Sequence, residues 1–167
     1  MSEKKSLEEI RGYWEAAAGA PVDAEGLRPV ARDPFLQQAV EDAVIPLLPA
    51  DSSVLDIGCG DGLSTLRFAQ GVKRITGVDY VERFVERARE AAGRAGVANA
   101  GFMRGDVLDL APVRAAVGPV DVAISIRCLI NLNSWERQRR ALDEIAACVR
   151  PGGLYLLSEG WSEGMDG

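Results

Sequence analysis

A glycine-rich turn constrains this chain more than any other feature. Residues 54–62, with the sequence VLDIGCGDG, are a short apolar run that ends in three glycines at alternate positions. An amphipathic segment follows at once. This order predicts a buried strand that passes through a tight turn into a helix. Because glycine has no side chain, a ligand can lie directly against the backbone of such a turn.

The charges around the turn indicate what kind of ligand it would bind. Between Ala50 and Leu66 the sequence has three aspartates, Asp51, Asp56 and Asp61, and no lysine or arginine. A turn that binds a diphosphate offers helix N–H groups, often with a basic side chain, to the negative charges. Carboxylates beside the turn would oppose such a ligand. They favour a nucleoside that carries positive charge, such as a sulfonium compound.

Four segments in order resemble the motifs of a known family. They are DIGCGDG at 56–62, GVDY at 77–80, RGDV at 104–107 and VRPGG at 149–153. The chain resembles the class I S-adenosylmethionine-dependent methyltransferases, closely from residue 54 to residue 159 and more loosely before that. The resemblance implies a methyltransferase that uses S-adenosyl-L-methionine as cofactor and releases S-adenosyl-L-homocysteine. The methyl group would pass to its acceptor by in-line displacement.

Strands and helices alternate along the chain from residue 54 onward. Such alternation is typical of right-handed crossovers and a parallel sheet. We therefore expect an α/β fold, with a doubly wound, mainly parallel, Rossmann-like sheet that has helices on both faces. The predicted strands are 54–58, 74–79, 101–104, 120–126 and 153–159, and the predicted helices are 62–70, 81–95, 110–117 and 134–149.

The first 49 residues are predicted to be a separate helical segment that could serve as a lid, and residues 50–167 are predicted to be the cofactor-binding core. A helix over residues 6–18 would carry Tyr13 and Trp14. These two aromatic residues fit a packing role on that helix as well as a cofactor lid. Asp33 is predicted to cap a second helix that begins at Pro34.

The resemblance implies roles for residues that follow the strands, where ligands sit in an open parallel sheet. Asp79 would accept hydrogen bonds from both ribose hydroxyls, and Tyr80 would lie against the adenine. Asp106 would meet the adenine amino group, with the backbone N–H of Val107 on the ring. Taken singly, Asp79 and Asp106 also fit the role of a helix N-cap. Their joint spacing from the glycines favours binding.

The remaining cofactor residues are expected at the turn and at the end of the fourth strand. Gly58, Gly60 and Asp56 would face the methionine end, while Ile126 and Arg127 would line the floor near the sulfonium. The whole predicted cofactor set is Tyr13, Trp14, Asp56, Gly58, Cys59, Gly60, Asp79, Tyr80, Asp106, Val107, Ile126 and Arg127. The candidates for contact with the substrate are Arg127, Asn131 and Asn133. No catalytic acid or base is identified.

Composition narrows the function classes. A chain of 167 residues that is 47% apolar can bury one core. The net charge of −6 disfavours nucleic acid as a partner. The absence of histidine removes imidazole as a general base or metal ligand. The three cysteines have no paired spacing, so we predict neither a disulfide framework nor a metal site.

The expected surroundings follow from the apolar runs. No run approaches the roughly twenty residues that span a bilayer, and the first residues lack the apolar core of a signal peptide. We expect a cytoplasmic protein with no membrane partner. The segment SIRC at 125–128 lacks the Asn/Asp-Pro-Pro-aromatic motif that is typical of enzymes that methylate bases or glutamine amides. This absence points to a small-molecule acceptor.

Other interpretations of the glycine-rich turn fit the sequence less well or stay open. A nicotinamide-binding Rossmann domain would need glycine where Leu63 stands, and the acidic turn also disfavours it. A phosphate-binding Walker loop is absent. A non-catalytic cofactor-binding or interaction protein on the same fold stays open, because cofactor binding alone would not distinguish it from an enzyme.

The C-terminal part of the sequence departs from the family pattern. The family's usual antiparallel strand pair after the fifth strand is expected to be missing, which would leave strand 153–159 as an apolar sheet edge. Truncation, a second chain over the edge and a degenerate fold are all compatible with this pattern. We expect self-association through this strand.

Overall fold

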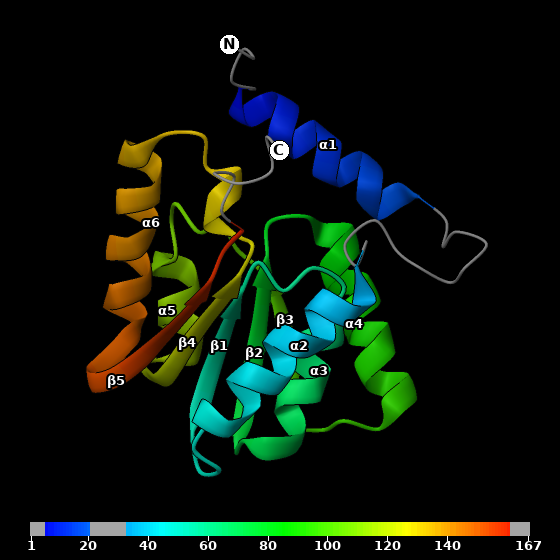
Figure 1. The fold of residues 1–167 in the computed structure, drawn as a ribbon, viewed down its shortest axis with the longest axis vertical. Helices are drawn as coiled ribbons and strands as arrows, with labels where there is room; N and C mark the ends of the chain where they lie inside the picture. The colour runs from blue at the N-terminus through cyan, green and yellow to red at the C-terminus, as the bar shows by residue number, and fades with distance from the viewer. Residues whose placement is uncertain (1–5, 21–32, 161–167) are drawn as a thin grey trace.

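The computed structural model describes residues 6–20 and 33–160. Its core is one parallel sheet in the order β3-β2-β1-β4-β5 (Figure 1). The chain order reverses between β1 and β4, which is where such sheets bind ligands. The strands are β1 (Ser53–Ile57), β2 (Arg74–Asp79), β3 (Ala100–Arg104), β4 (Val120–Ile126) and β5 (Val149–Ser158).

Helices cover both faces of the sheet and so confirm the predicted doubly wound architecture (Figure 1). On one face α2, α3 and α4 pack, and on the other α5 and α6. Helix α1 lies across the end of the sheet at which the strands finish. The helices are α1 (Leu7–Gly19), α2 (Pro34–Val44), α3 (Leu63–Phe68), α4 (Glu82–Ala95), α5 (Ala111–Val117) and α6 (Trp135–Cys148), with short 3-10 turns η1 (Ile45–Leu47), η2 (Ala69–Gly71) and η3 (Leu129–Asn131).

Local sequence explains where the first helices begin. Ser6 and Glu9 form a reciprocal capping box at the start of α1. Asp33 caps α2 by accepting a hydrogen bond from the backbone N–H of Leu36 at 2.9 Å, and Pro34 is the first helical residue. The predicted cap at Asp33 is therefore confirmed.

Alternate residues of the strands supply the two halves of the core, because side chains point to opposite faces along a strand. Leu55 and Ile57 of β1 pack with α5 and α6. Val54 packs with α2 and α3 on the opposite face. Asp56 is two residues after Val54, so its side chain points to the same face of the sheet, toward α3.

The last strand starts earlier than the sequence predicted. β5 begins at Val149, which pairs with Val120, and the register shifts between Val120 and Val122. This irregularity accommodates Pro151 and Gly152, the latter with φ +77°, because an edge strand tolerates a proline and a bulge. Pro151 and Gly152, which lie outside the predicted strand 153–159, are therefore part of β5, and so is Val149, which was predicted to end a helix.

The outer edge of β5 has no partner strand within the described residues. The sheet ends at β5, and no antiparallel pair follows it in residues 6–20 and 33–160. Leu154 and Leu157 are 46% and 51% exposed along this strand. In the same described ranges, no helix is long and apolar enough to cross a membrane.

Candidate functional site

A cavity of about 340 Å³ lies at the carboxyl ends of the strands, beneath α1. The structure brings most of the predicted site residues together in its walls. Those that line it are Tyr13, Trp14, Gly58, Gly60, Asp79, Tyr80, Asp106, Val107, Ile126, Arg127 and Asn131. Asp56 and Cys59 instead line a smaller adjoining cavity of about 50 Å³. Asn133 lines neither cavity.

The glycines of the turn line the large cavity or allow close packing, and Gly58 does both, since a Cβ there would lie 2.9 Å from Sγ of Cys128. Gly58 and Gly60 have φ +74° and +55°, in the left-handed region that favours glycine, and both line the large cavity. Gly62, with φ +81°, has a different role. A Cβ atom there would lie 2.8 Å from the Cβ of Ala88 and 2.9 Å from the ring of Phe102. The third glycine is therefore required for close packing of α4 and β3 against the turn.

The carboxylate of Asp79 connects the glycine turn to the start of α4. Its Oδ2 accepts a hydrogen bond from the backbone N–H of Gly60 at 3.0 Å, and its Oδ1 accepts one from Val81 at 2.9 Å. The side chain is buried, and this burial raises the pKa of Asp79. Each carboxylate oxygen can accept more than one hydrogen bond. The carboxylate can therefore still accept hydrogen bonds from a ligand in the large cavity, in addition to those from Gly60 and Val81.

Asp56 is buried on the opposite side of the turn. Its Oδ2 accepts a hydrogen bond from the hydroxyl of Thr65 in α3. Burial, the largest cause, together with the nearby Asp79 and Glu41, raises the pKa of Asp56 to about 6. Asp56 thus lies beside the small cavity rather than in the large one, because of its place in the alternation along β1.

Helix α1 is held over the large cavity by polar contacts. Arg11 forms an ion pair with Asp106, and its guanidinium lies 5.7 Å from the centroid of the Tyr80 ring. The indole N–H of Trp14 donates to Oδ1 of Asn131 at 3.3 Å. Sequence reasoning included Trp14 but missed Arg11. A signal was present, since Arg11 lies three positions before Trp14 on one helix face.

The residue after β4 has an unusual backbone. Arg127 has φ +52° and is the one non-glycine residue with positive φ in the described part of the chain. Such a conformation is strained for a residue with a side chain and is concentrated at functional sites. The backbone N–H of Arg127 donates to the carbonyl of Ser158 at 2.7 Å. Arg127 lines both cavities and therefore stands between them.

The two predicted substrate-side asparagines separate in space. Asn131 lines the large cavity, and its amide donates to the carbonyl of Arg127 at 2.8 Å. The Oδ1 of Asn133 accepts a hydrogen bond from Arg137, one turn into α6. Of the pair, Asn131 is the one in a position to touch a ligand in the cavity.

Glu159, which sequence reasoning missed, organises the segment after β4. Its Oε1 accepts from the backbone N–H groups of Cys128 at 3.1 Å and Leu129 at 2.8 Å, and its Oε2 accepts from Ile130 at 3.2 Å. Its half-burial raises the pKa of Glu159. A carboxylate directly after the fifth strand was the available signal, because strand ends meet at the ligand-binding edge.

The side chains of the site are suited to binding and orienting a ligand rather than to nucleophilic attack by a cysteine. Burial raises the pKa of both Cys59 and Cys128 well above the usual thiol range, so neither is a thiolate nucleophile near neutral pH. The carboxylates in the large cavity belong to Asp79 and Asp106, and most other lining side chains are apolar. Arg11 and Arg127 balance these two carboxylates. A largely apolar cavity with a few charged groups is typical of a small-molecule site.

Comparison with known proteins agrees with this geometry. A family model described as a methyltransferase domain matches residues 54–153. A curated protein of Encephalitozoon cuniculi that carries a methyltransferase name is 35% identical over 107 residues, which are 64% of this chain and 44% of that protein. The uncharacterised methyltransferase YcgJ of Bacillus subtilis is 33% identical over 108 residues, which are 65% of this chain and 40% of YcgJ.

A solved structure shares the fold. The N-methyltransferase NodS from Bradyrhizobium japonicum, in complex with S-adenosyl-L-homocysteine, superposes with a TM-score of 0.72 at 21% identity, covering 87% of this chain and 71% of NodS. The chain spans less than half the length of the two curated relatives named above. The matched region contains the glycine turn, Asp79, Asp106 and Arg127. The chain belongs to the class I S-adenosylmethionine-dependent methyltransferase family.

Proposed function

We propose that this protein binds S-adenosylmethionine in the large cavity and transfers its methyl group to a small-molecule acceptor. One observation carries the proposal: Gly58, Gly60, Asp79 and Asp106 line one cavity at the reversal point of the sheet. Family membership supports the same conclusion. The cavity volume of about 340 Å³ falls within the ordinary range for small-molecule sites.

The residues of the cavity fit the parts of the cofactor. Asp79 would hold the ribose hydroxyls with oxygens that already accept from the turn and from the start of α4. Tyr80 would lie against the adenine. Its hydroxyl is buried and has no hydrogen-bond partner among the described residues. Asp106 and Val107 would meet the adenine edge.

The bound cofactor supplies an electrophilic methyl group on a sulfonium, and the sulfur keeps the electron pair when the acceptor takes that methyl. The protein's task is then alignment of the acceptor with the methyl carbon. Alignment of this kind can supply on the order of 7–11 kcal/mol of the barrier. The side chains that would face the acceptor are Arg127 and Asn131, next to the apolar Ile130 and Leu132.

The residues around Arg127 and Asn131 indicate which class of acceptor the cavity would bind. Ile10 of α1, Ile130 and Leu132 make the acceptor side largely apolar, with α1 as a lid. This arrangement favours a small, mainly apolar molecule with one polar group that Asn131 or Arg127 could bind. The net charge of −6 supports a small molecule over a nucleic acid. A cytoplasmic location belongs to the same proposal.

Self-association is a further part of the proposal. The outer edge of β5 is open within the described residues, and two of its leucines are half exposed. An unpaired edge of this composition readily adds another strand. A second copy of the chain is the partner that such an edge would meet at high concentration.

Calorimetry and a transfer assay test the function in two steps. S-adenosylmethionine and S-adenosylhomocysteine should bind with micromolar-range affinity, on the order of −8 kcal/mol, and NAD should bind far more weakly. Label from methyl-labelled cofactor should then appear in a component of a metabolite pool. Tight NAD binding without a response to either sulfur nucleoside contradicts the proposal. Cofactor binding with no transfer to any pool favours the non-catalytic alternative.

A further inference from the structure

The charged side chains that line the large cavity are separated along the sheet. Asp106 follows β3 and Asp79 ends β2, whereas Arg127 follows β4, beyond β1 in the strand order. Arg11, the other cation among the described residues of the cavity wall, forms an ion pair with Asp106. At the β4 end of the cavity, the charge is therefore the positive charge of Arg127.

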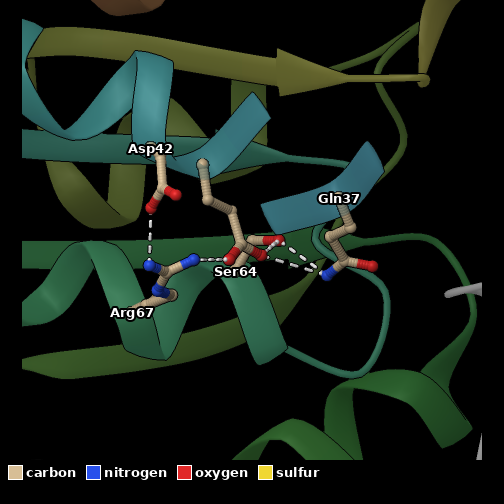
Figure 2. A network of polar contacts seen from close by, with 5 residues as sticks. Gln37, Asp42, Ser64 and Arg67 are labelled. Atoms are coloured by element: carbon tan, nitrogen blue, oxygen red, sulfur yellow. Dashed lines mark hydrogen bonds and ion pairs between the residues drawn. The ribbon is translucent and has the colours of Figure 1, made fainter. Parts of the chain in front are cut away.

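Arg67 of α3 belongs to a polar network beside the small cavity. Its guanidinium pairs with Glu41 and with Asp42 of α2, each at 2.6 Å (Figure 2). Glu41 also accepts from the hydroxyl of Ser64 at 2.6 Å and from the amide of Gln37 at 3.1 Å. Gln37 and Ser64 line the small cavity, but Arg67 does not. The charge of Arg67 thus balances two carboxylates of the protein and joins α2 to α3.

The backbone of Arg127 is anchored by hydrogen bonds. Its N–H donates to the carbonyl of Ser158 at 2.7 Å, and its carbonyl accepts from the amide of Asn131 at 2.8 Å. Asn131 in turn accepts from the indole of Trp14. Burial raises the pKa of Glu159, and the nearby charge of Arg127 opposes that rise. A guanidinium has five N–H donors, so Arg127 can serve a ligand in addition to a partner in the protein.

The surroundings of Arg127 indicate the kind of anion that would fit. Ile126 precedes it in the cavity wall, and Ile130, Leu132 and Ile10 make the acceptor side largely apolar. A guanidinium beside apolar walls suits a molecule with a hydrocarbon body and an anionic head. The planar fork of arginine matches the two oxygens of a carboxylate.

A carboxylate can act as the nucleophile here without a base. A carboxylic acid, with a pKa of about 4, is ionised near neutral pH, whereas an alkylamine or a phenol, with a pKa of about 10, keeps its proton. The chain has no histidine to remove such a proton. In the cavity wall, burial raises the pKa of the Cys128 thiol and of the Tyr80 hydroxyl, so neither is ionised near neutral pH.

Methylation of a carboxylate balances without a proton. One carboxylate oxygen forms a bond to the methyl carbon, the bond between that carbon and sulfur breaks, and its electron pair stays on sulfur. An anion and a sulfonium thus become a neutral methyl ester and a neutral thioether. Because opposite charges attract more strongly in an apolar cavity than in water, the walls of this site favour the approach of the two reactants.

We propose, building on the methyl transfer proposed above, that the acceptor is a small, mainly apolar carboxylic acid that is methylated on its carboxylate. Arg127 is the specificity-determining residue, and its guanidinium binds the carboxylate of the acceptor. Asn131 is a positioning residue, because it holds the carbonyl of Arg127 and contacts Trp14 of α1.

Three probes with one hydrocarbon chain test the preference for a carboxylate. Octanoate, octylamine and octanol have an anionic, a cationic and a neutral head near neutral pH. Calorimetry would measure their binding to protein saturated with S-adenosylhomocysteine, in which the cofactor's own carboxylate is already bound. We expect octanoate to bind at least about tenfold more tightly than either of the others, because a hydrogen bond between charged groups is stronger than one to a neutral group.

Variants assign this preference to Arg127. Arg127→Gln should weaken binding of octanoate at least about tenfold and change binding of octanol less than about twofold. Arg139→Gln, at an exposed position of α6, should change neither. If Arg127→Gln does not fold, Arg127→Lys replaces it, since lysine keeps the charge and loses the planar fork, and the same selective loss is expected. Octanoate that binds no more tightly than octanol, or an equal loss for both probes, overturns the inference.

The product of the reaction gives a second, independent test on the wild type. Methyl-labelled cofactor would be incubated with the protein and a metabolite pool, and the labelled product would then be treated with alkali. A methyl ester releases its label as volatile methanol, whereas N-methyl groups and methyl ethers keep it. We expect the label to become volatile. Label that stays in the product overturns the inference and leaves the methyltransferase function standing, whereas a protein that does not bind S-adenosylhomocysteine refutes the proposed function itself.

Discussion

Arg11 in α1 and Asp106 after β3, 95 positions apart in the chain, form an ion pair at the large cavity. The pair fixes α1 over the carboxyl ends of the strands, and it engages the carboxylate that the family resemblance assigns to the adenine amino group. In the proposed complex, the cofactor and α1 would therefore share the side chain of Asp106. Entry of the adenine would then require Asp106 to give up part of its contact with Arg11 or to accept from both.

Removal of Arg11 should make the cavity easier to enter. In Arg11→Ala we expect a faster association rate for S-adenosylhomocysteine, because the pair that holds α1 over the cavity is lost. The affinity should change less than about fivefold, since a partly exposed pair contributes at most about 1 kcal/mol. Stopped-flow tryptophan fluorescence would follow the rate. The control is Arg94→Ala, which breaks an exposed pair with Glu90 on α4. An unchanged rate would mean that α1 does not limit entry.

Asp79 should affect both binding and stability. Asp79→Ala should weaken cofactor binding by roughly 1.5–3 kcal/mol, the range for hydrogen bonds to a charged group. It should also lower the free energy of unfolding, because the N–H groups of Gly60 and Val81 lose their acceptor. Calorimetry and thermal unfolding measure the two effects, with the exposed Asp109→Ala as control. Unchanged affinity in a folded Asp79→Ala protein would leave Asp79 with the structural role alone.

Asp56 should make stability depend on pH in an unusual direction. Its pKa is raised from 3.8 to about 6 in the folded protein, so the folded state binds the proton more tightly than the unfolded state. The stabilisation is complete below about pH 4 and is lost as the pH rises through 6. The loss is on the order of 3 kcal/mol, at about 1.4 kcal/mol per pKa unit.

A single substitution isolates this contribution. Asp56→Asn cannot titrate but can still accept the hydrogen bond from Thr65. Urea unfolding of both proteins from pH 4 to pH 7 should therefore show the wild type losing stability relative to Asp56→Asn across this window. Parallel curves for the two proteins would show that Asp56 has an ordinary pKa.

The edge of β5 should govern self-association. Leu157 is 51% exposed at the unpaired strand, and a charged side chain there blunts the edge. Sedimentation velocity at tens of micromolar should show association of the wild type that persists at high salt, as expected for a contact without surface ion pairs. Leu157→Lys should weaken it, whereas Phe35→Lys, at an exposed position on α2, should not. A monomeric wild type at these concentrations would refute the proposal.

The local sequence predicted most of the scaffold. β2 and β4 have the predicted bounds, and β1 and β3 differ by one residue at their ends. These strands are dense in apolar and β-branched residues between clear helix signals, so pattern and structure agree. β5 was predicted too short because Pro151 and Gly152 normally end a strand, and only the bulge opposite Val120 accommodates them.

The candidate site was predictable where it depends on order along the chain. The glycines and Asp106 follow strands, Asp79 is the last residue of one, and parallel strands bring their ends together. Arg11 and Glu159 were missed although their positions, three residues before Trp14 on α1 and directly after β5, were signals in the sequence. Gln37 was not predicted, because its contacts join distant segments. The partners of Gln37 are Glu41, one helical turn away, and Ser64, 27 positions along the chain. No local pattern specifies such a pairing.

The left-handed backbone of Arg127 should make selection for stability and selection for activity favour different residues at this position. A glycine at position 127 would adopt φ +52° without the steric penalty of a side chain. It would also remove the guanidinium that stands between the two cavities. Laboratory evolution for heat resistance alone would thus be expected to lose this arginine, and evolution under selection for turnover would be expected to keep it.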